Sequence, residues 1–363
     1  MYNGLDPTLP PLSARRPSTH EEGDAPVNEN ASAAHGTADK LLSVRDLSIT
    51  AGGLTLVNGV SFDLKAGTTT ALVGESGSGK SLTAQAILGL LNPQIYMVSG
   101  TALTFQGKPL HFDGRQPPAG FSGRLTGFVM QDPSSALDPT MTVGRQIAEM
   151  FIVHRGLGMR AALREAARML DFVRIPDAAA RIGDYPHQFS GGMKQRVLIA
   201  MAVALSPRLL VADEPTTALD VTVQAEILTL IDDLRAELDM TVLIITHDFG
   251  VVYQCADRTL VMYAGKLVEG GETLQVTESG RHPYTRGLID SIPDIDDLDR
   301  PVVAIPGQPP RAGRNWSDSC AFHSRCGWRA ERCLSHTPEM ESLANGAAIR
   351  CFEWRRAISE ARA

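Results

Sequence analysis

Short hydrophobic runs alternate with longer segments of helical periodicity from about residue 41 onward. The short runs have the length and the branched or aromatic residues typical of strands, at residues 42–44, 54–57, 60–64, 70–73, 103–105, 127–130, 209–212 and 241–245. Helical patterns cover residues 82–91, 192–205 and 221–238. Strands that alternate with helices predict an α/β fold with a mainly parallel sheet.

A helical stretch interrupts this alternation between about residues 133 and 190. Leu163, Ala166 and Leu170 fall at helical spacing, with Arg and Glu on the opposite face, as in an amphipathic helix. The pattern predicts a helical subdomain inserted into the sheet domain. Residues 107–123 are rich in Pro and Gly and are predicted to form a loop.

The composition changes at both ends of the chain. Residues 1–40 hold five prolines and a single aromatic residue, Tyr2, so we expect a disordered tail that cannot bury enough apolar surface to fold. After residue 280, six prolines fall within thirty residues and four of the five cysteines follow. This shift predicts a small, Cys-rich C-terminal domain over residues 281–363, after a sheet domain over residues 41–280.

Bulk properties narrow the function classes. The 363 residues are 43% hydrophobic and 21% charged, as in ordinary globular proteins. The net charge of −7 gives no support to a nucleic-acid partner. The longest apolar run, residues 197–205, is far shorter than a membrane span, and no signal-peptide pattern opens the chain. We therefore expect a cytosolic protein, with its cysteines reduced or bound to metal.

A phosphate-binding loop is the strongest motif. Residues 74–81, GESGSGKS, match G-x-x-x-x-G-K-[ST] between a predicted strand and a predicted helix, which is the context that the motif requires. Backbone N–H groups of such a loop surround a phosphate chain, while Lys80 would reach the β- and γ-phosphates and Ser81 would bind Mg²⁺. The residues expected at the nucleoside triphosphate are Gly74, Glu75, Ser76, Gly77, Ser78, Gly79, Lys80, Ser81 and Leu82.

Two further motifs point to phosphate chemistry. The apolar run of residues 209–212 ends in Asp213 and Glu214, which are suited to hold Mg²⁺ and to polarise an attacking water. Residues 189–196, FSGGMKQR, place a capping Ser190 and two glycines, Gly191 and Gly192, at a helix start, which makes a second anion-binding site. One chain needs only one such site, unless the second serves a nucleotide held by another chain.

These motifs together resemble one family. Residues 74–81, 189–196 and 209–215, with His247 after the next strand, are similar to the nucleotide-binding subunits of ABC transporters over about residues 41–280. The resemblance implies the ABC cassette, a P-loop NTPase of RecA-like fold with an inserted helical subdomain. It also implies ATP and Mg²⁺ as cofactors.

The resemblance assigns roles at matching positions. Gln131 would contact Mg²⁺ and the attacking water and begin the region, up to about residue 147, that contacts the membrane subunits. Asp220 would lie in the loop that crosses the interface between two ATPase subunits, and His247 would contact the γ-phosphate. The implied catalytic residues are Lys80, Gln131, Glu214 and His247, the Mg²⁺ ligands are Ser81, Gln131 and Asp213, and the residues facing a second subunit's nucleotide are Ser190, Gly191, Gly192 and Asp220.

One position departs from the family pattern. The family usually carries an aromatic residue near its start that stacks on adenine, whereas residues 50–52 are Thr-Ala-Gly and no aromatic residue occurs between Leu41 and Val60. Stacking on adenine is therefore expected to be weak or to come from elsewhere in the chain.

The residues after the cassette narrow the subfamily. Residues 282–288 (HPYTRGL), 291–293 (SIP) and 305–310 (IPGQPP) resemble the oligopeptide/dipeptide import ATPases, a group that also includes importers of nickel and of some sugar derivatives. The implied partners are a second ATPase subunit, identical or homologous, two membrane permeases and an extracytoplasmic peptide-binding protein, at the cytoplasmic face of the membrane. The alternatives are an ABC ATPase without a permease and a chiefly redox-regulated protein.

Four cysteines are candidates for metal ligands. Cys320, Cys326, Cys333 and Cys351 have the spacing C-x5-C-x6-C-x17-C, which lacks the C-x2-C pairs common in zinc sites. The resemblance implies a 4Fe–4S cluster. Zinc, with His323 or His336 as a further ligand, and ordinary buried thiols are the alternatives. Cys255 lies in an apolar pattern and is expected in the core.

Overall fold

A computed structural model describes residues 40–110, 120–292, 303–310, 319–344 and 346–361, and Asp39–Ala363 forms one compact unit. The tail expected over residues 1–40 lies outside the described residues except for Lys40, which begins the first strand. No helix in the described part of the chain combines the length and the apolar character needed to cross a membrane.

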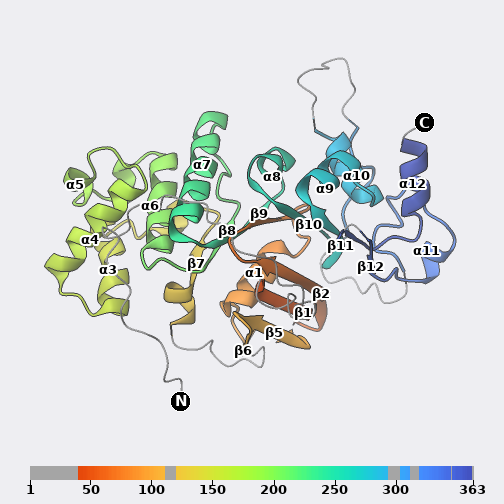
Figure 1. Cartoon of the computed structure of the whole chain (residues 1–363), viewed down its shortest axis with the longest axis horizontal. Helices are drawn as coiled ribbons and strands as arrows, with labels where there is room; N and C mark the ends of the chain where they lie inside the picture. The colour runs from red at the N-terminus through yellow and green to blue at the C-terminus, as the bar shows by residue number, and fades with distance from the viewer. Residues whose placement is uncertain (1–39, 111–119, 293–302, 311–318, 345, 362–363) are drawn as a thin grey trace, which may run out of the picture. The chain divides into compact units, whose positions relative to one another are not determined.

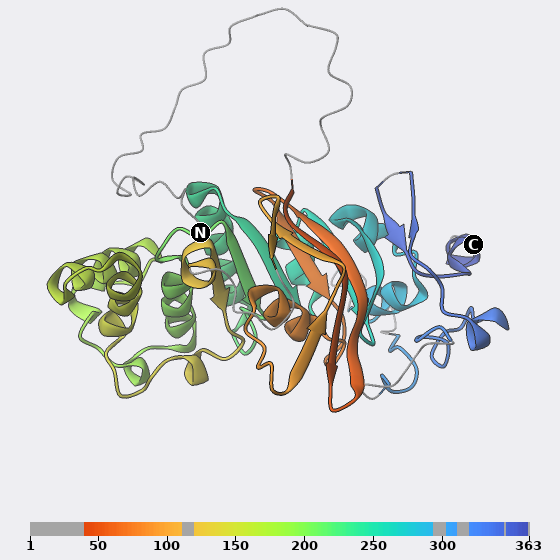
Figure 2. The ribbon, with the colours of Figure 1, turned by 90° about the horizontal axis from the view of Figure 1, so that it is seen from below.

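A five-stranded antiparallel sheet forms from the first part of the chain (Figure 2). Its strands are β1 (Lys40–Ala51), β2 (Leu54–Lys65), β4 (Tyr96–Ser99), β5 (Ala102–Phe105) and β6 (Lys108–Leu110). The two strands predicted over residues 54–57 and 60–64 are one strand, because the intervening Asn58 and Gly59 lie in a bulge of the β1–β2 pairing. Leu41, Leu42, Val44, Leu47 and Ile49 of β1 are buried and form part of the core.

The loop predicted over residues 107–123 is partly wrong. Gln106 and Gly107 both have positive φ values, 50° and 72°, as in the tight turns that match the twist of two antiparallel strands. They therefore connect β5 to the short strand β6. Residues 111–119 of the predicted loop lie outside the described residues. The backbone of η2 (Phe121–Leu125) is irregular, because Ser122 (φ −77°, ψ 133°) and Gly123 (φ 88°, ψ −40°) leave the helical region.

An eight-stranded sheet forms the centre of the structure (Figure 1). Its order is β12-β13-β11-β10-β3-β9-β8-β7, with β3 (Thr69–Val73), β7 (Thr126–Val129), β8 (Leu209–Asp213), β9 (Thr241–Thr246), β10 (Arg258–Tyr263), β11 (Lys266–Glu272), β12 (Glu341–Ser342) and β13 (Ala348–Ile349). The strands from β10 to β7 run parallel, as the sequence predicts. Every residue of β3, β8 and β9 is buried, as in parallel sheets that are covered on both faces.

Helices connect and cover these strands. They are α1 (Lys80–Leu88), α2 (Pro133–Ala136), α3 (Val143–Arg155), α4 (Met159–Phe172), α5 (Ala178–Arg181), α6 (Gly191–Val203), α7 (Val221–Leu238), α8 (Phe249–Cys255), α9 (Thr273–Ser279), α10 (Pro283–Asp290), α11 (Arg332–Ser335) and α12 (Trp354–Ala361). The helix predicted over residues 82–91 begins earlier, at Lys80, and ends at Leu88, because Gly89 takes the left-handed conformation with φ 68°.

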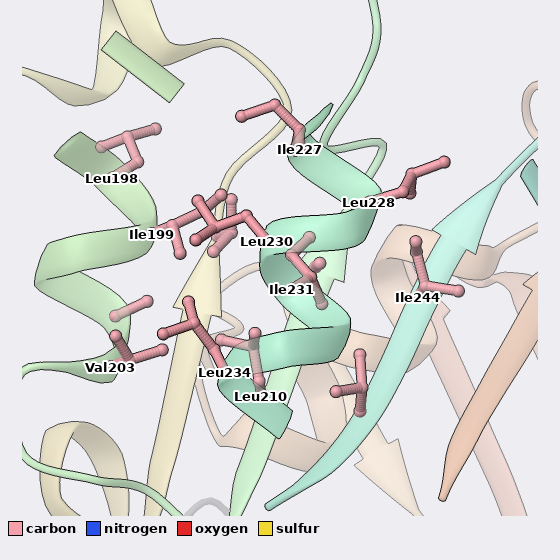
Figure 3. Close-up of a cluster of buried hydrophobic side chains, with 14 of the residues drawn as sticks. Leu198, Ile199, Val203, Leu210, Ile227, Leu228, Leu230, Ile231, Leu234 and Ile244 are labelled. Atoms are coloured by element: carbon pink, nitrogen blue, oxygen red, sulfur yellow. The ribbon is translucent and has the colours of Figure 1, made fainter. Parts of the chain in front are cut away.

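Helices α2 to α6 lie between β7 and β8 in the chain, where the sequence predicts helices (Figure 1). In α4 the buried residues Ala162, Ala166, Met169 and Leu170 keep helical spacing. Toward the sheet, α6 and α7 share a core in which Ile199, Leu230 and Leu234 lie together (Figure 3). This packing sets the start of α6, and with it residues 190–192, beside the start of α7.

The C-terminal residues extend the central sheet. Strand β13 pairs antiparallel with β11, with Ile349 opposite Glu269, and β12 pairs with β13. Residues from the end of the chain therefore share a sheet with β3, the strand that leads into the phosphate loop.

Gly127 in β7 tests the close contact between the sheet and α6. An added Cβ there would lie 2.3 Å from the carbonyl oxygen of Ala202, so Gly127→Ala is expected to lower the free energy of unfolding by about 1–3 kcal/mol. Urea unfolding measures the change. Gly183→Ala is the control, because nothing lies within 4 Å of its added Cβ and a change below about 0.5 kcal/mol is expected. Equal effects of the two substitutions would contradict this packing.

Candidate nucleotide-binding site

The phosphate loop connects β3 to α1 and depends on two glycines. Gly74 has φ 151° and Gly79 has φ 102°, values that side chains rarely adopt. An added Cβ at Gly74 would lie 2.1 Å from the carbonyl oxygen of Met262, and one at Gly79 would lie 2.9 Å from the side chain of the same residue. Neighbouring strand β10 thus leaves room only for glycine, so the loop backbone is free to face a phosphate chain.

The ammonium group of Lys80 lies inside the curve of the loop. Its Nζ donates hydrogen bonds to the carbonyl oxygens of Gly74 at 2.7 Å and Glu75 at 3.1 Å. Burial lowers the pKa of Lys80, against the attraction of Glu214, Asp213 and Glu75, which acts to raise it. The sequence predicts that Lys80 contacts the phosphates of the nucleotide. In the structure its ammonium group lies within the phosphate loop.

Ser81 and Asp213 meet across the site. The Ser81 Oγ donates a hydrogen bond to Asp213 Oδ1 at 3.0 Å, and Asp213 is buried at the end of β8. Burial raises the pKa of the Asp213 carboxyl, although the Ser81 hydrogen bond acts to lower it and Glu214 raises it further. Two oxygen donors from separate motifs therefore lie together, and oxygen is the donor that Mg²⁺ prefers.

The carboxylate of Glu214 contacts three other side chains of the site. Its Oε2 accepts hydrogen bonds from Gln131 Nε2 at 2.8 Å and Thr217 Oγ1 at 2.9 Å. Its Oε1 lies 3.2 Å from His247 Nδ1. Burial acts to raise the pKa of Glu214, but the hydrogen bonds with Thr217 and His247 outweigh burial and lower it. Glu214 is therefore ionised at neutral pH and held in one orientation.

The order of the parallel strands explains why these residues meet. The loop follows β3, His247 follows β9, Asp213 ends β8 and Gln131 follows β7, and these four strands are neighbours in the sheet. Parallel strands place their carboxyl ends at one edge, where α/β proteins bind ligands. Thr217 is the partner that the motifs did not indicate, and its only signal is its position three residues after Glu214.

The residues of the FSGGMKQR motif form a second group. Ser190 caps α6 by accepting a hydrogen bond from the Met193 N–H, as predicted. Asp220 caps α7 by accepting one from the Val223 N–H. An added Cβ at Gly192 would lie 2.5 Å from the side chain of Val223. The starts of α6 and α7 are thus in close contact, outside the hydrogen-bonded group around Glu214.

An aromatic ring lies beside the position where the family pattern lacks one. Ala51 is directly opposite Tyr96 in the antiparallel pairing of β1 with β4. Directly opposite residues project from the same face of a sheet. The side chain of Tyr96, which no motif pointed to, therefore projects from the same face as that of Ala51, where it packs against the buried cluster that includes Ile49.

The cysteines of the C-terminal residues converge. Cys320, Cys326, Cys333 and Cys351 all line one cavity together with His323, whereas His336 is not among the lining residues. Burial raises the pKa of Cys326 to about 11 and that of Cys351 to about 12. Within the described ranges, no group of three or more His, Cys, Asp or Glu side chains has the arrangement to hold a metal ion. Cys255 lies apart, half-buried against the core.

Comparisons with known sequences agree with this geometry. Residues 57–217 match the family described as ABC transporter, and residues 268–333 match the one described as oligopeptide/dipeptide transporter, C-terminal region. The chain is 42% identical to the oligopeptide transport ATP-binding protein OppD of Salmonella typhimurium, across 90% of this chain and 98% of that protein. It is 42% identical to the dipeptide transport ATP-binding protein DppD of Bacillus subtilis, across 86% and 95% respectively.

Solved structures show the same cassette fold. The ABC transporter component cbiO1 of Clostridium perfringens is 27% identical, with a TM-score of 0.56 over 66% of this chain and 90% of that chain. The ADP-bound ATP-binding cassette MJ0796, at 24% identity, has a TM-score of 0.55 over 64% of this chain and 98% of that chain. The chain therefore belongs to the ATP-binding proteins of the ABC transporters, in the group that carries the oligopeptide/dipeptide transporter C-terminal region.

Proposed function

We propose that this protein is the ATP-hydrolysing subunit of an ABC importer for dipeptides or oligopeptides. The proposal rests mainly on one observation: Lys80, Ser81, Asp213 and Glu214 lie together at the same edge of the sheet. The peptide assignment is supported by the match of residues 268–333 to the oligopeptide/dipeptide region and by relatives named for peptide transport. Import of nickel or another small solute, and an ATPase without a permease, are the alternatives.

The phosphate loop and the two strand-end carboxylates, Asp213 and Glu214, would have different roles in ATP hydrolysis. The loop N–H groups and Lys80 would bind the β- and γ-phosphates and offset the charge that grows on them during transfer. Ser81, Asp213 and Gln131 would hold Mg²⁺, which supplies further positive charge at the phosphate oxygens when bound. The paired oxygens of Ser81 and Asp213 fit that hard cation.

Glu214 would act as the general base. Its low pKa keeps it ionised, and its hydrogen bonds with Gln131, Thr217 and His247 orient both oxygens. The carboxylate would accept a proton as water attacks the γ-phosphorus in line with the leaving ADP oxygen. His247, whose side chain is 57% exposed, can swing toward the γ-phosphate without breaking the core.

A second ATPase subunit, identical or homologous, would complete each site. Ser190, Gly191 and Gly192 begin a 13-residue helix, whose positive end favours phosphate, yet they lie outside the hydrogen-bonded group around Glu214. In a head-to-tail pair they would face the partner's ATP, and Asp220 would cross the interface. Gln131 and residues 132–147 would contact two permeases, which receive peptide from an extracytoplasmic binding protein.

The chain divides by role in this proposal. Residues 41–280 form the ABC cassette, with a helical subdomain at about 133–190, and residues 281–363 form the C-terminal domain. The whole would sit peripherally at the cytoplasmic face of the membrane.

We further propose that Cys320, Cys326, Cys333 and Cys351 hold a 4Fe–4S cluster, with zinc as the alternative. Four thiols line one cavity, and four thiolates are the donor set of both groups. Since no three of the described His, Cys, Asp or Glu side chains are arranged around an ion, binding would have to draw the four thiols together. The raised pKa values of Cys326 and Cys351 mean that binding must displace protons from these thiols. When bound, the group would supply electron-transfer or purely structural chemistry, apart from the hydrolytic site.

Glu214→Gln tests the assignment of the base. The amide cannot accept the proton, so the ATPase rate is expected to fall about 100-fold or more, while ATP affinity changes by less than about threefold, since Lys80 and Ser81 remain. Phosphate release and nucleotide titration measure the two quantities. Glu237→Gln, at an exposed residue of α7, should change neither. A Glu214→Gln protein that hydrolyses ATP at the wild-type rate would exclude Glu214 as the base.

Cys326→Ser tests the metal site. Anaerobically purified wild-type protein is expected to carry about four irons with matching sulfide and a brown chromophore, and Cys326→Ser should lose them. Cys255→Ser, outside the cavity, should keep them. Stoichiometric zinc in place of iron would establish the alternative metal. Wild-type protein without any metal would refute the site.

A further inference from the structure

We propose that Arg325 is a positioning residue for the phosphate loop: it holds Glu75, and through Glu75 the loop, in the shape that receives ATP. Arg325 lies next to Cys326 in the cysteine segment (residues 320–333), 250 positions away from Glu75 in the chain. The proposal makes the C-terminal residues a working part of the nucleotide site.

The contact between the two residues is a paired and largely buried one. Arg325 Nη1 lies 2.7 Å from Glu75 Oε2, and Nη2 donates to Oε1 at 3.0 Å. The Arg325 side chain is 4% exposed and that of Glu75 is 26% exposed. The Arg325 Nε also donates to the carbonyl oxygen of Pro306 at 2.8 Å. Planar two-bond pairs of this kind fix orientation as well as charge.

A second C-terminal residue holds the backbone at the same point. The Glu75 N–H donates a hydrogen bond to the hydroxyl of Tyr284 at 2.8 Å. Tyr284 is fully buried at the start of α10, where His282 Nδ1 accepts a hydrogen bond from its N–H. Both the main chain and the side chain of Glu75 are therefore held by residues that follow the cassette.

Aromatic rings fix the Arg325 guanidinium in place. Its central carbon lies 5.8 Å from the ring centroid of Tyr263 and 5.9 Å from that of Phe322. Phe322 packs edge-on against Tyr263, with centroids 5.2 Å apart, and also lines the cavity of the four cysteines. The ring of Phe322 thus links the cavity to the guanidinium that holds the loop.

The negative charge of Glu75 explains why the phosphate loop needs Arg325 as a partner. The carbonyl of Glu75 accepts a hydrogen bond from Lys80 Nζ, so the residue lies where the triphosphate would bind. A carboxylate that was free to turn toward the phosphates would repel them, since like charges interact strongly where water is partly excluded. Arg325 neutralises the Glu75 charge and directs it away from the phosphates. The pair thereby keeps the loop ready for an anion.

A double substitution separates this role from simple stabilisation. Arg325→Gln leaves the Glu75 carboxylate without its partner, so the Kd for a fluorescent ATP analogue is expected to rise about tenfold, with the KM for ATP rising more than kcat falls. Adding Glu75→Gln removes the negative charge, and the Kd of the double variant should return to within about threefold of the wild-type value. Substitution of a residue that only stabilised the fold would lower the free energy of unfolding and leave the Kd of the folded protein unchanged.

Arg355→Gln is the matched control. Arg355 also lies near the end of the chain and pairs with a carboxylate, Glu341, but its side chain is 69% exposed, so its Kd should equal that of wild type. An unchanged Kd in Arg325→Gln, or a double variant as weak as Arg325→Gln, would overturn the proposal. Should Arg325→Gln fail to fold, Arg325→Lys replaces it: a KM for ATP raised about threefold at constant kcat supports the proposal, and an unchanged KM overturns it.

Discussion

The parallel alignment of β7, β8, β9 and β3 is the constraint on which the site depends. Residues that lie far apart in the chain reach one edge of the sheet because each of these strands ends there. The hydrogen bonds from Ser81 to Asp213 and from Gln131 to Glu214 connect the side chains that lie along this edge. Because every residue of β3, β8 and β9 is buried, a shift in register would place their side chains in mismatched packing positions on the two covered faces. The positions of the polar groups are therefore tied to the core.

Asp213 and Glu214 are adjacent in the chain, but their surroundings suit the two carboxyl groups to different roles. Burial raises the pKa of Asp213, which ends a fully buried strand, whereas hydrogen bonds with Thr217 and His247 lower that of Glu214. Glu214 also has a positive φ of 47°, a conformation that costs free energy in a residue with a side chain. That conformation turns the chain away from the strand and directs the second carboxylate toward Gln131. Adjacent carboxyl groups in unlike surroundings can thus serve metal binding and base catalysis separately.

Much of this arrangement could be predicted from the sequence, because the phosphate loop, the strand-end carboxylates and the capped helix starts are local patterns. Predictions failed where a local pattern met a longer-range one. Asn58 and Gly59 fit into a bulge opposite β1 instead of ending the strand, and Lys108–Leu110 pairs with β5 as a strand inside the loop predicted over residues 107–123. Partners distant in the chain had no local signal. Tyr96 opposite Ala51 follows from strand pairing alone, and the contact of Arg325 with Glu75 follows from the packing of the C-terminal residues against the cassette.

The C-terminal residues connect the four-cysteine cavity to the phosphate loop through only a few side chains. Phe322 borders both the four-cysteine cavity and the Arg325 guanidinium, and Tyr284 and Arg325 meet the loop at one residue, Glu75. Packed rings transmit displacement well, because a close-packed interior has little free volume to absorb it. A change of size or charge in the cavity would therefore be passed to the phosphate loop through Phe322 and Arg325. This gives a physical reason for a cysteine-lined cavity beside an ATPase that needs no redox step of its own.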